Sequence, residues 1–101
     1  MTRIEIQQRN IEITDDLRNH VHDRLGLALG RFADRIGRVI VRFSHADGHV
    51  SGADTRCQIE VSLRPWSVDV EDTDADQFAA VNHAADRASR SVARTLERER
   101  Q

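Results

Sequence analysis

The sequence predicts a single α+β domain with the element order β-α-β-β-β-α. A four-stranded mixed sheet carries two roughly parallel helices packed on one face. Four short segments alternate apolar and polar residues, as strands with one buried face do, and two longer segments repeat apolar residues at spacings of three and four, as helices do. Each of the six segments has only one apolar side, so the helices and the sheet are expected to cover each other. The length of 101 residues fits one domain, residues 1–101.

The first strand and the first helix are each marked by their own pattern. Ile4 and Ile6 alternate with polar neighbours, which predicts a strand over residues 2–8. Thr14 is a favourable N-cap, and two aspartates follow it in the first turn, so a helix is expected over about 15–34. Its apolar stripe consists of Leu17, Val21, Leu25, Ala28, Leu29 and Phe32. Gly26 and Gly30 weaken a helix, and we interpret them as points of close approach to a neighbouring element.

Three further strands follow the first helix. Val39, Val41 and Phe43 alternate with polar or outward residues, and the alternation over 56–64 is the clearest in the chain. Between them, residues 45–54 predict a long polar loop. Arg64-Pro65-Trp66 predicts a tight connection to a short strand over 67–71, with Trp66 sheltering the end of the sheet or stacking on a base. A right-handed crossover would make the first two strands parallel, and the last three would form an antiparallel meander.

The final helix is predicted from residue 76 to residue 98 and has two distinct stripes. The apolar stripe consists of Phe78, Val81, Ala85, Ala88, Val92 and Leu96, and the basic stripe of His83, Arg87, Arg90, Arg94 and Arg98. Asp86 stands four residues before Arg90 and is expected to pair with it. The acidic segment 69–76, with five carboxylates and no base, is expected at one end of the helix pair, and Asp74 or Asp76 caps the helix.

Charge and composition indicate which kinds of partner the protein can bind and where in the cell it is expected. The net charge is −2, but the acidic segment hides a basic C-terminal helix. All fifteen basic residues are arginine, the side chain best suited to bind phosphates and to stack on bases. The first helix adds Arg24, Arg31 and Arg35 along one flank. No apolar run is long enough to cross a bilayer and no signal peptide is evident, so a soluble cytoplasmic protein without a membrane partner is expected.

Other residue types that often carry chemistry are better explained structurally. His45, Asp47, His49, Asp54 and Cys57 include metal-ligand types, but their spacing fits no closed zinc pattern, so no metal is expected. Cys57 is expected to be a buried small hydrophobe. No nucleophile–base spacing, phosphate-binding glycine loop or paired carboxylate is present, so we expect no enzyme, no cofactor and no small-molecule substrate.

The chain resembles the short ribosome hibernation-promoting factors, also called ribosome-associated inhibitors, which share an S30EA-type ribosome-binding domain. The resemblance rests on three stretches and covers nearly the whole chain. They are Arg9-Asn10-Ile11-Glu12-Ile13-Thr14-Asp15-Asp16-Leu17-Arg18 with Arg24-Leu25, Phe32-Ala33-Asp34-Arg35-Ile36, and Asp76-Gln77-Phe78-Ala79-Ala80-Val81-Asn82 with Asp86-Arg87. Leu27 and Leu96 stand where the family has basic residues.

The resemblance implies a function without chemistry. Members bind ribosomal RNA of the small subunit at its decoding region and silence 70S ribosomes in stressed or stationary bacterial cells. By position, the family's basic residues that bind RNA correspond to Arg24, Arg35, Arg87, Arg90, Arg94 and Arg98. The charge pattern adds Arg31 and His83 to the expected RNA-binding residues. We also expect no C-terminal dimerisation domain and a monomer off the ribosome. The alternative is a protein-interaction module of the same fold whose RNA affinity has decayed.

Overall fold

The computed structural model describes residues 3–46 and 54–100 and has the predicted element order. The elements are β1 (Arg3–Gln8), α1 (Asp15–Leu29), the 3-10 turn η1 (Gly30–Phe32), β2 (Arg38–His45), β3 (Thr55–Ser62), β4 (Ser67–Asp74) and α2 (Gln77–Glu99). Of the predicted 45–54 loop, residues 47–53 lie outside the described residues. No helix in the two described stretches is long and apolar enough to cross a membrane.

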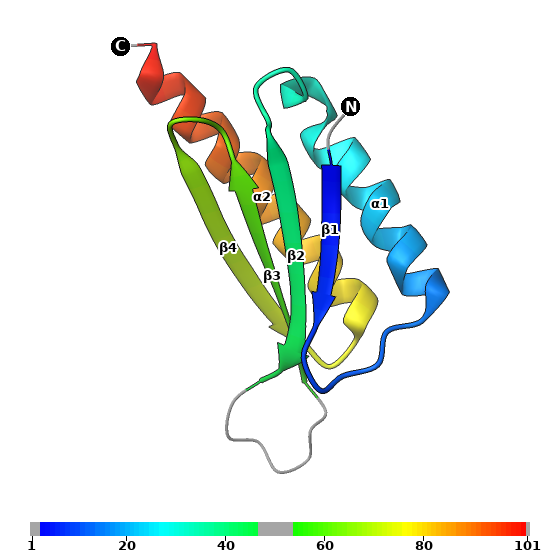
Figure 1. The fold of residues 1–101 in the computed structure, drawn as a ribbon. Helices are drawn as coiled ribbons and strands as arrows, with labels where there is room; N and C mark the ends of the chain where they lie inside the picture. Colours follow the sequence, from blue (N-terminus) through cyan, green and yellow to red (C-terminus); the bar gives the residue numbers. More distant parts are fainter. Residues whose placement is uncertain (1–2, 47–53, 101) are drawn as a thin grey trace.

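The four strands form one mixed sheet in the order β1-β2-β3-β4. β1 runs parallel to β2, with Ile4 opposite Val39, and the remaining neighbours are antiparallel. Both helices lie on the same face of the sheet and run in roughly the same direction (Figure 1). Each begins near the end of the sheet at which β2 ends and runs toward the opposite end. The predicted fold class is therefore confirmed, and in residues 3–46 and 54–100 no helix covers the other face of the sheet.

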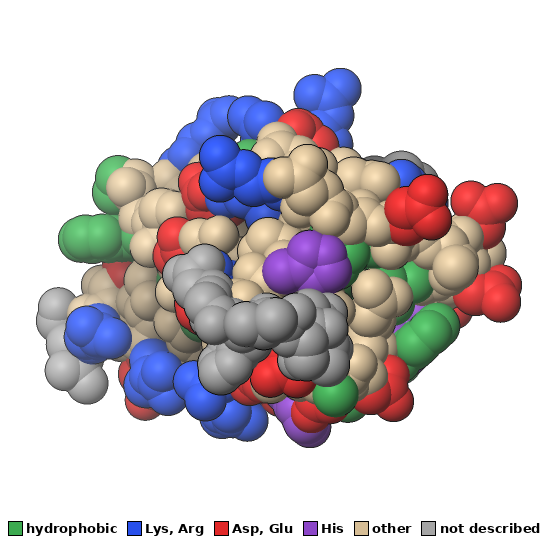
Figure 2. Space-filling view, turned by 90° about the horizontal axis from the view of Figure 1, so that it is seen from below, with side chains coloured by type: hydrophobic (Ala, Val, Ile, Leu, Met, Phe, Trp, Pro, Cys, Tyr) green, Lys and Arg blue, Asp and Glu red, His purple; other side chains and the backbone are tan. Residues whose placement is uncertain are grey.

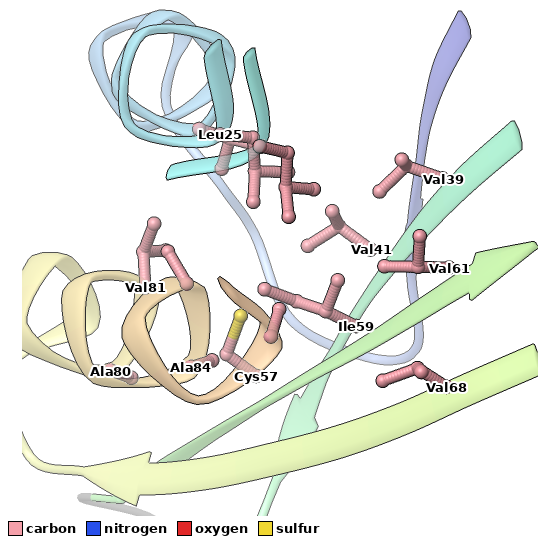
Figure 3. Packing of buried hydrophobic residues seen from close by; sticks show 14 of the residues in the cluster. Leu25, Val39, Val41, Cys57, Ile59, Val61, Val68, Ala80, Val81 and Ala84 are labelled. Atoms are coloured by element: carbon pink, nitrogen blue, oxygen red, sulfur yellow. The ribbon is translucent and has the colours of Figure 1, made fainter. Parts of the chain in front are cut away.

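The hydrophobic core lies between the sheet and the helix pair. Side chains from α1, α2 and the central strands converge there, including Leu25, Ile59 and Val81 (Figure 3). Cys57 belongs to this core, as predicted, and burial raises the pKa of its thiol to about 12. A thiol with so high a pKa holds almost no thiolate at neutral pH, so Cys57 acts as a small hydrophobe.

Both helices begin at the predicted caps. Thr14 Oγ1 accepts a hydrogen bond from Leu17 N at 3.1 Å, and Asp76 Oδ1 accepts from Phe78 N at 2.8 Å. These bonds satisfy backbone donors that have no partner inside the helix. At its other end α1 stops at Leu29 and tightens into η1, so the prediction of a regular helix to residue 34 is wrong.

The two glycines of α1 do not mark a close approach, which corrects the interpretation given above. A Cβ atom built on Gly26 or Gly30 would meet nothing within 4 Å outside its immediate chain neighbours and the helix backbone. Gly26 lies inside α1 at an exposed position, so its only energetic effect is the greater backbone entropy it gives the unfolded chain.

Replacing Gly26 by alanine is therefore expected to stabilise the protein by about 0.5–1 kcal/mol, because alanine restricts the unfolded chain and meets no obstacle in the folded one. Urea unfolding followed by circular dichroism measures this as a higher midpoint at an unchanged slope. A lower midpoint for Gly26→Ala would contradict the open environment of this residue.

The acidic segment is placed only in part as predicted. Asp74 and Asp76 lie at the end of the helix pair where α2 begins, but residues 69–74 also extend β4, which pairs with β3 as far as Asp74 opposite Thr55. The alternation of Val68 and Val70 continues into Asp72 and Asp74, which therefore point to the face of the sheet that carries the helices. The carboxylates of Asp72 and Asp74 thus lie beside α2.

Candidate nucleic-acid interface

The basic stripe of α2 lies on the outer side of the helix. The five residues of the stripe are exposed, while the side that meets the sheet is lined by small and branched apolar residues. Those buried residues are Ala80, Val81, Ala84, Ala85, Ala88 and Val92. Viewed from the end at which α2 begins, arginine side chains gather at the top and lower left of the surface, and acidic side chains lie at the right and also beside the arginines (Figure 2).

The first part of the stripe is paired with β4. Arg87 Nε donates to Asp72 Oδ2 at 3.1 Å, and His83 Nδ1 lies 3.8 Å from Asp72 Oδ1 and 4.0 Å from Asp74 Oδ2. These contacts join the exposed basic side chains of His83 and Arg87 to the end of the edge strand β4. Solvent screens such pairs, and each contributes at most about 1 kcal/mol. An incoming phosphate would have to compete with Asp72 for Arg87.

The second part of the stripe is open. Within residues 3–46 and 54–100, no carboxylate lies within ion-pair distance of Arg90, Arg94 or Arg98. The expected pair of Asp86 with Arg90 is wrong, because Asp86 instead contacts α1. Three like charges at four-residue spacing repel one another, at a cost of a few tenths of a kcal/mol per pair. We call Arg90, Arg94 and Arg98 the open arginine row.

Arg24 of α1 connects the two helices rather than facing solvent. Its Nε donates to Asn82 Oδ1 at 3.1 Å and its Nη2 to Asp86 Oδ1 at 2.9 Å, and its side chain is only 28% exposed. His20 Nε2 lies 2.7 Å from the same Asn82 oxygen, and its ring is 5.0 Å from that of Phe78. This cluster fixes the spacing of α1 and α2, so the structure gives Arg24 a helix-pairing contact.

Arg31 and Arg35 border a hollow at the far end of the helix pair. Its volume is about 580 Å³, and Leu96 and Arg100 of the C-terminal end contribute to its opposite side. Arg31 Cζ stands 4.5 Å from the centre of the Phe32 ring, a cation–π contact. The sequence reasoning missed Arg100, because it lies off the basic stripe and just past the end of α2.

Arg35 holds Glu99, which in turn holds Trp66. Arg35 Nη2 lies 2.9 Å from both carboxylate oxygens of Glu99, and Trp66 Nε1 donates to Glu99 Oε2 at 3.1 Å. The hydrogen bond from Arg35 lowers the pKa of Glu99 below its usual value, opposed by partial desolvation and reinforced by the indole. The same contact raises the pKa of Arg35.

The eight predicted residues lie in separate groups on the structure. Arg24 lies in the seam between the helices, Arg31 and Arg35 border the hollow, and His83 and Arg87 face β4. Only the open arginine row presents a continuous series of side chains free of carboxylate contacts within the described residues. An exposed row of guanidinium groups with this spacing can bind successive phosphates of a nucleic acid.

The metal-ligand types noted above fall partly outside the structure. Asp47 and His49 lie outside the described residues, so the arrangement of that loop is not defined here. Among the residues that the structure does describe, no group of three or more His, Cys, Asp or Glu side chains is arranged to hold a metal ion.

Trp66 fluorescence should report the protonation of Glu99, since Trp66 is the single tryptophan. A carboxylate whose pKa is lowered by folding stabilises the fold above the unfolded pKa, near 4.5, and this contribution is lost as pH falls through the lower folded value. We expect an emission change with a midpoint below pH 4.5, absent in Glu99→Gln. Asp34 and Glu97 border the same hollow in both proteins, so the difference isolates Glu99. A midpoint at or above pH 4.5 would contradict the Arg35 contact.

Comparison with known proteins gives one family. The sequence pattern of the family described as Sigma 54 modulation protein / S30EA ribosomal protein matches residues 4–100. The ribosome-binding factor PSRP1, chloroplastic, of Spinacia oleracea is 27% identical over 78 residues, which are 75% of this chain and 26% of that protein. The ribosome hibernation promotion factor of Deinococcus radiodurans is 25% identical over 88 residues, which are 87% of this chain and 46% of that protein. The chain therefore spans less than half the length of these two relatives.

Solved structures similar to this chain agree with the family match. The N-terminal domain of Thermus thermophilus Protein Y superposes with a TM-score of 0.75 at 33% identity, covering 94% of this chain and 99% of that one. A ribosomal subunit interface protein from Coxiella burnetii has a TM-score of 0.78 at 15% identity, covering 96% and 99%. The second likeness concerns the fold alone.

Proposed function

Because the chain belongs to the Sigma 54 modulation protein / S30EA ribosomal protein family, we propose that it binds RNA of the small ribosomal subunit and silences ribosomes. The observation that carries this proposal is the open arginine row, an exposed cationic series for which the described fold supplies no carboxylate partner. Two relatives support a ribosomal partner by their names, a ribosome-binding factor and a ribosome hibernation promotion factor.

The proposed contact is mainly electrostatic. Guanidinium groups of Arg90, Arg94 and Arg98 donate to phosphate oxygens along one RNA strand, and each neutralised phosphate releases condensed counterions. The helix pair supplies a rigid support, since Arg24, Asn82 and Asp86 lock α2 against α1. Folded ribosomal RNA is recognised chiefly through shape and backbone, which suits an arginine-rich surface.

The site proposed on the subunit is the decoding region, where the domain would block the paths of mRNA and tRNA. Binding alone would then stop translation, without catalysis and without a cofactor, in the cytoplasm of a stressed or stationary-phase cell. Arg35, His83 and Arg87 would join the contact once phosphates compete with Glu99 and Asp72 for them. Arg31, which borders the same hollow as Arg35, would join beside it. Arg24 would act mainly by positioning α2.

Sucrose-gradient sedimentation of the purified protein with isolated small ribosomal subunits tests this proposal. We expect the protein to migrate with the subunits at low salt and to be released at high salt, because its affinity depends on counterion release. Protein that stays at the top of the gradient under all salt conditions would exclude the proposal. That outcome would favour a protein-interaction module, a function consistent with the acids that already occupy Arg24, Arg35 and Arg87.

A further inference from the structure

Trp66 is a large aromatic side chain in the turn between β3 and β4, as predicted. It is 49% exposed. The turn is closed by Leu63 N, which donates to Trp66 O at 2.8 Å, so the backbone of this residue is held at the end of the hairpin. Because about half of the indole stays in contact with water, the protein loses part of the stabilisation that burying this side chain would give. Of the two roles predicted for Trp66, sheltering the end of the sheet accounts for only part of the ring, and stacking on a base would use the exposed part.

The orientation of the indole is fixed by its polar edge. Trp66 Nε1 donates to Glu99 Oε2 at 3.1 Å, and Arg35 holds the carboxylate of Glu99 from the other side at 2.9 Å. The ring is thus tied to the last turn of α2 and to the segment after η1. With its only polar atom satisfied, the indole has its π-faces left for contact. A ring held in place loses little entropy when a flat partner stacks on it.

The surface beside the indole carries a positive charge from the open arginine row. Trp66, Thr95, Arg98 and Glu99 line a shallow hollow of about 180 Å³. This is smaller than the roughly 300–1,000 Å³ of pockets for drug-sized ligands. It suits a single flat group attached to a larger molecule. Arg98 is both the wall of this hollow and the last member of the row, so a strand lying on the row would reach the indole.

We propose that Trp66 and Arg98 form a stacking site for one unpaired base of an RNA whose phosphates lie along Arg90, Arg94 and Arg98. This rests on the proposed function and specifies its ligand, a single-stranded segment at the end of the arginine row. Every base offers a π-face, so an aromatic platform beside a cationic groove binds unpaired nucleotides with little sequence preference. Arg98 contributes both a phosphate contact and a guanidinium plane against the base.

Binding of Trp66→Ala and Trp66→Phe to isolated small ribosomal subunits tests the site. Removing one base–aromatic stack should weaken binding about 5- to 100-fold in Trp66→Ala, and Trp66→Phe should stay within about 3-fold of the original because a ring remains. Circular dichroism and the unfolding midpoint verify that both variants are folded. If wild-type protein binds subunits and Trp66→Ala binds equally well, the stacking site is wrong while the proposed function stands.

A second measurement is independent of the ribosome. Trp66 fluorescence is followed during titration with an eight-nucleotide oligoadenylate, with an abasic oligoribonucleotide of the same length, and with adenosine monophosphate. Stacking predicts quenching by the oligoadenylate and little change with the abasic chain, which offers the same phosphates without bases. Equal effects of both oligonucleotides, or no effect of either, would overturn the site. Binding of the mononucleotide as tightly as the oligoadenylate would overturn its assignment to RNA.

Discussion

Replacing Arg90, Arg94 and Arg98 together by glutamate is expected to abolish binding to the small ribosomal subunit. The three side chains form the exposed row that has no carboxylate partner in the described residues, so their contacts would be made in the complex and not in the free protein. At about 1.5 kcal/mol for each lost charged hydrogen bond, three contacts correspond to roughly a thousandfold loss of affinity. Repulsion between the new carboxylates and phosphates adds to this loss.

The fold should survive this change. The three positions are exposed, and the four-residue spacing sets like charges beside each other before and after replacement, so that repulsion stays similar. A matched control is the triple change of Arg3, Arg9 and Arg38 to glutamate. It alters net charge equally on exposed positions at or beside β1 and β2. Among the described residues it breaks the ion pair of Arg38 with Glu5 and removes the attraction between Arg3 and Glu5. Equal loss of binding in both triple variants would show that net charge, not the row, governs affinity.

The second large effect is expected in the core. Leu25→Ala should destabilise the protein by about 2–5 kcal/mol, because it removes a buried side chain and leaves a cavity between α1 and the sheet. Leu25 is 2% exposed and packs in the cluster that unites both helices with the central strands. Since domains of this size are stable by only about 5–15 kcal/mol, this single change removes a large share of the total.

Leu27 provides the control for that measurement. It stands two residues away in the same helix but is 78% exposed. Leu27→Ala removes the same atoms without opening a cavity, so its free energy of unfolding should stay within about 0.5 kcal/mol of the original. Urea unfolding of the two variants measures the difference. Similar losses at both positions would show that Leu27 packs against something that the described fold does not contain.

The fold could be predicted from the sequence because each element follows a simple periodicity. Alternation in the strands and the apolar stripes of the helices gave the order, the sheet and the side on which the helices lie, and the predicted family is confirmed. The predicted end of β4 was wrong, because there the strand preference of the individual residues competes with pairing to the neighbouring strand. Aspartates disfavour strands, so the predicted strand stopped at residue 71, whereas pairing with β3 carries β4 on to Asp74.

The site could be predicted only in part, because its electrostatics depend on partners distant in the sequence. Helical spacing placed the basic stripe of α2 correctly on one exposed side. The carboxylates that hold Arg24 and Arg35 are 62 and 64 residues away, and the sequence offers no local signal for those contacts. For the same reason the contact of Trp66 with Glu99 was missed. Of the eight candidates, Arg24, Arg35, His83 and Arg87 have carboxylate partners among the described residues, and Arg90, Arg94 and Arg98 are the candidates on α2 that remain.

The salt dependence of binding to small ribosomal subunits tests the central claim most directly. Wild-type protein is compared with the variant in which Arg90, Arg94 and Arg98 are all glutamine, which removes the charges without adding new ones. Each phosphate contact contributes roughly 0.7–0.9 to the slope of log affinity against log salt, so we predict a slope about 2–3 shallower in the variant. Identical slopes for the two proteins would contradict the account, because the row would then not meet phosphates.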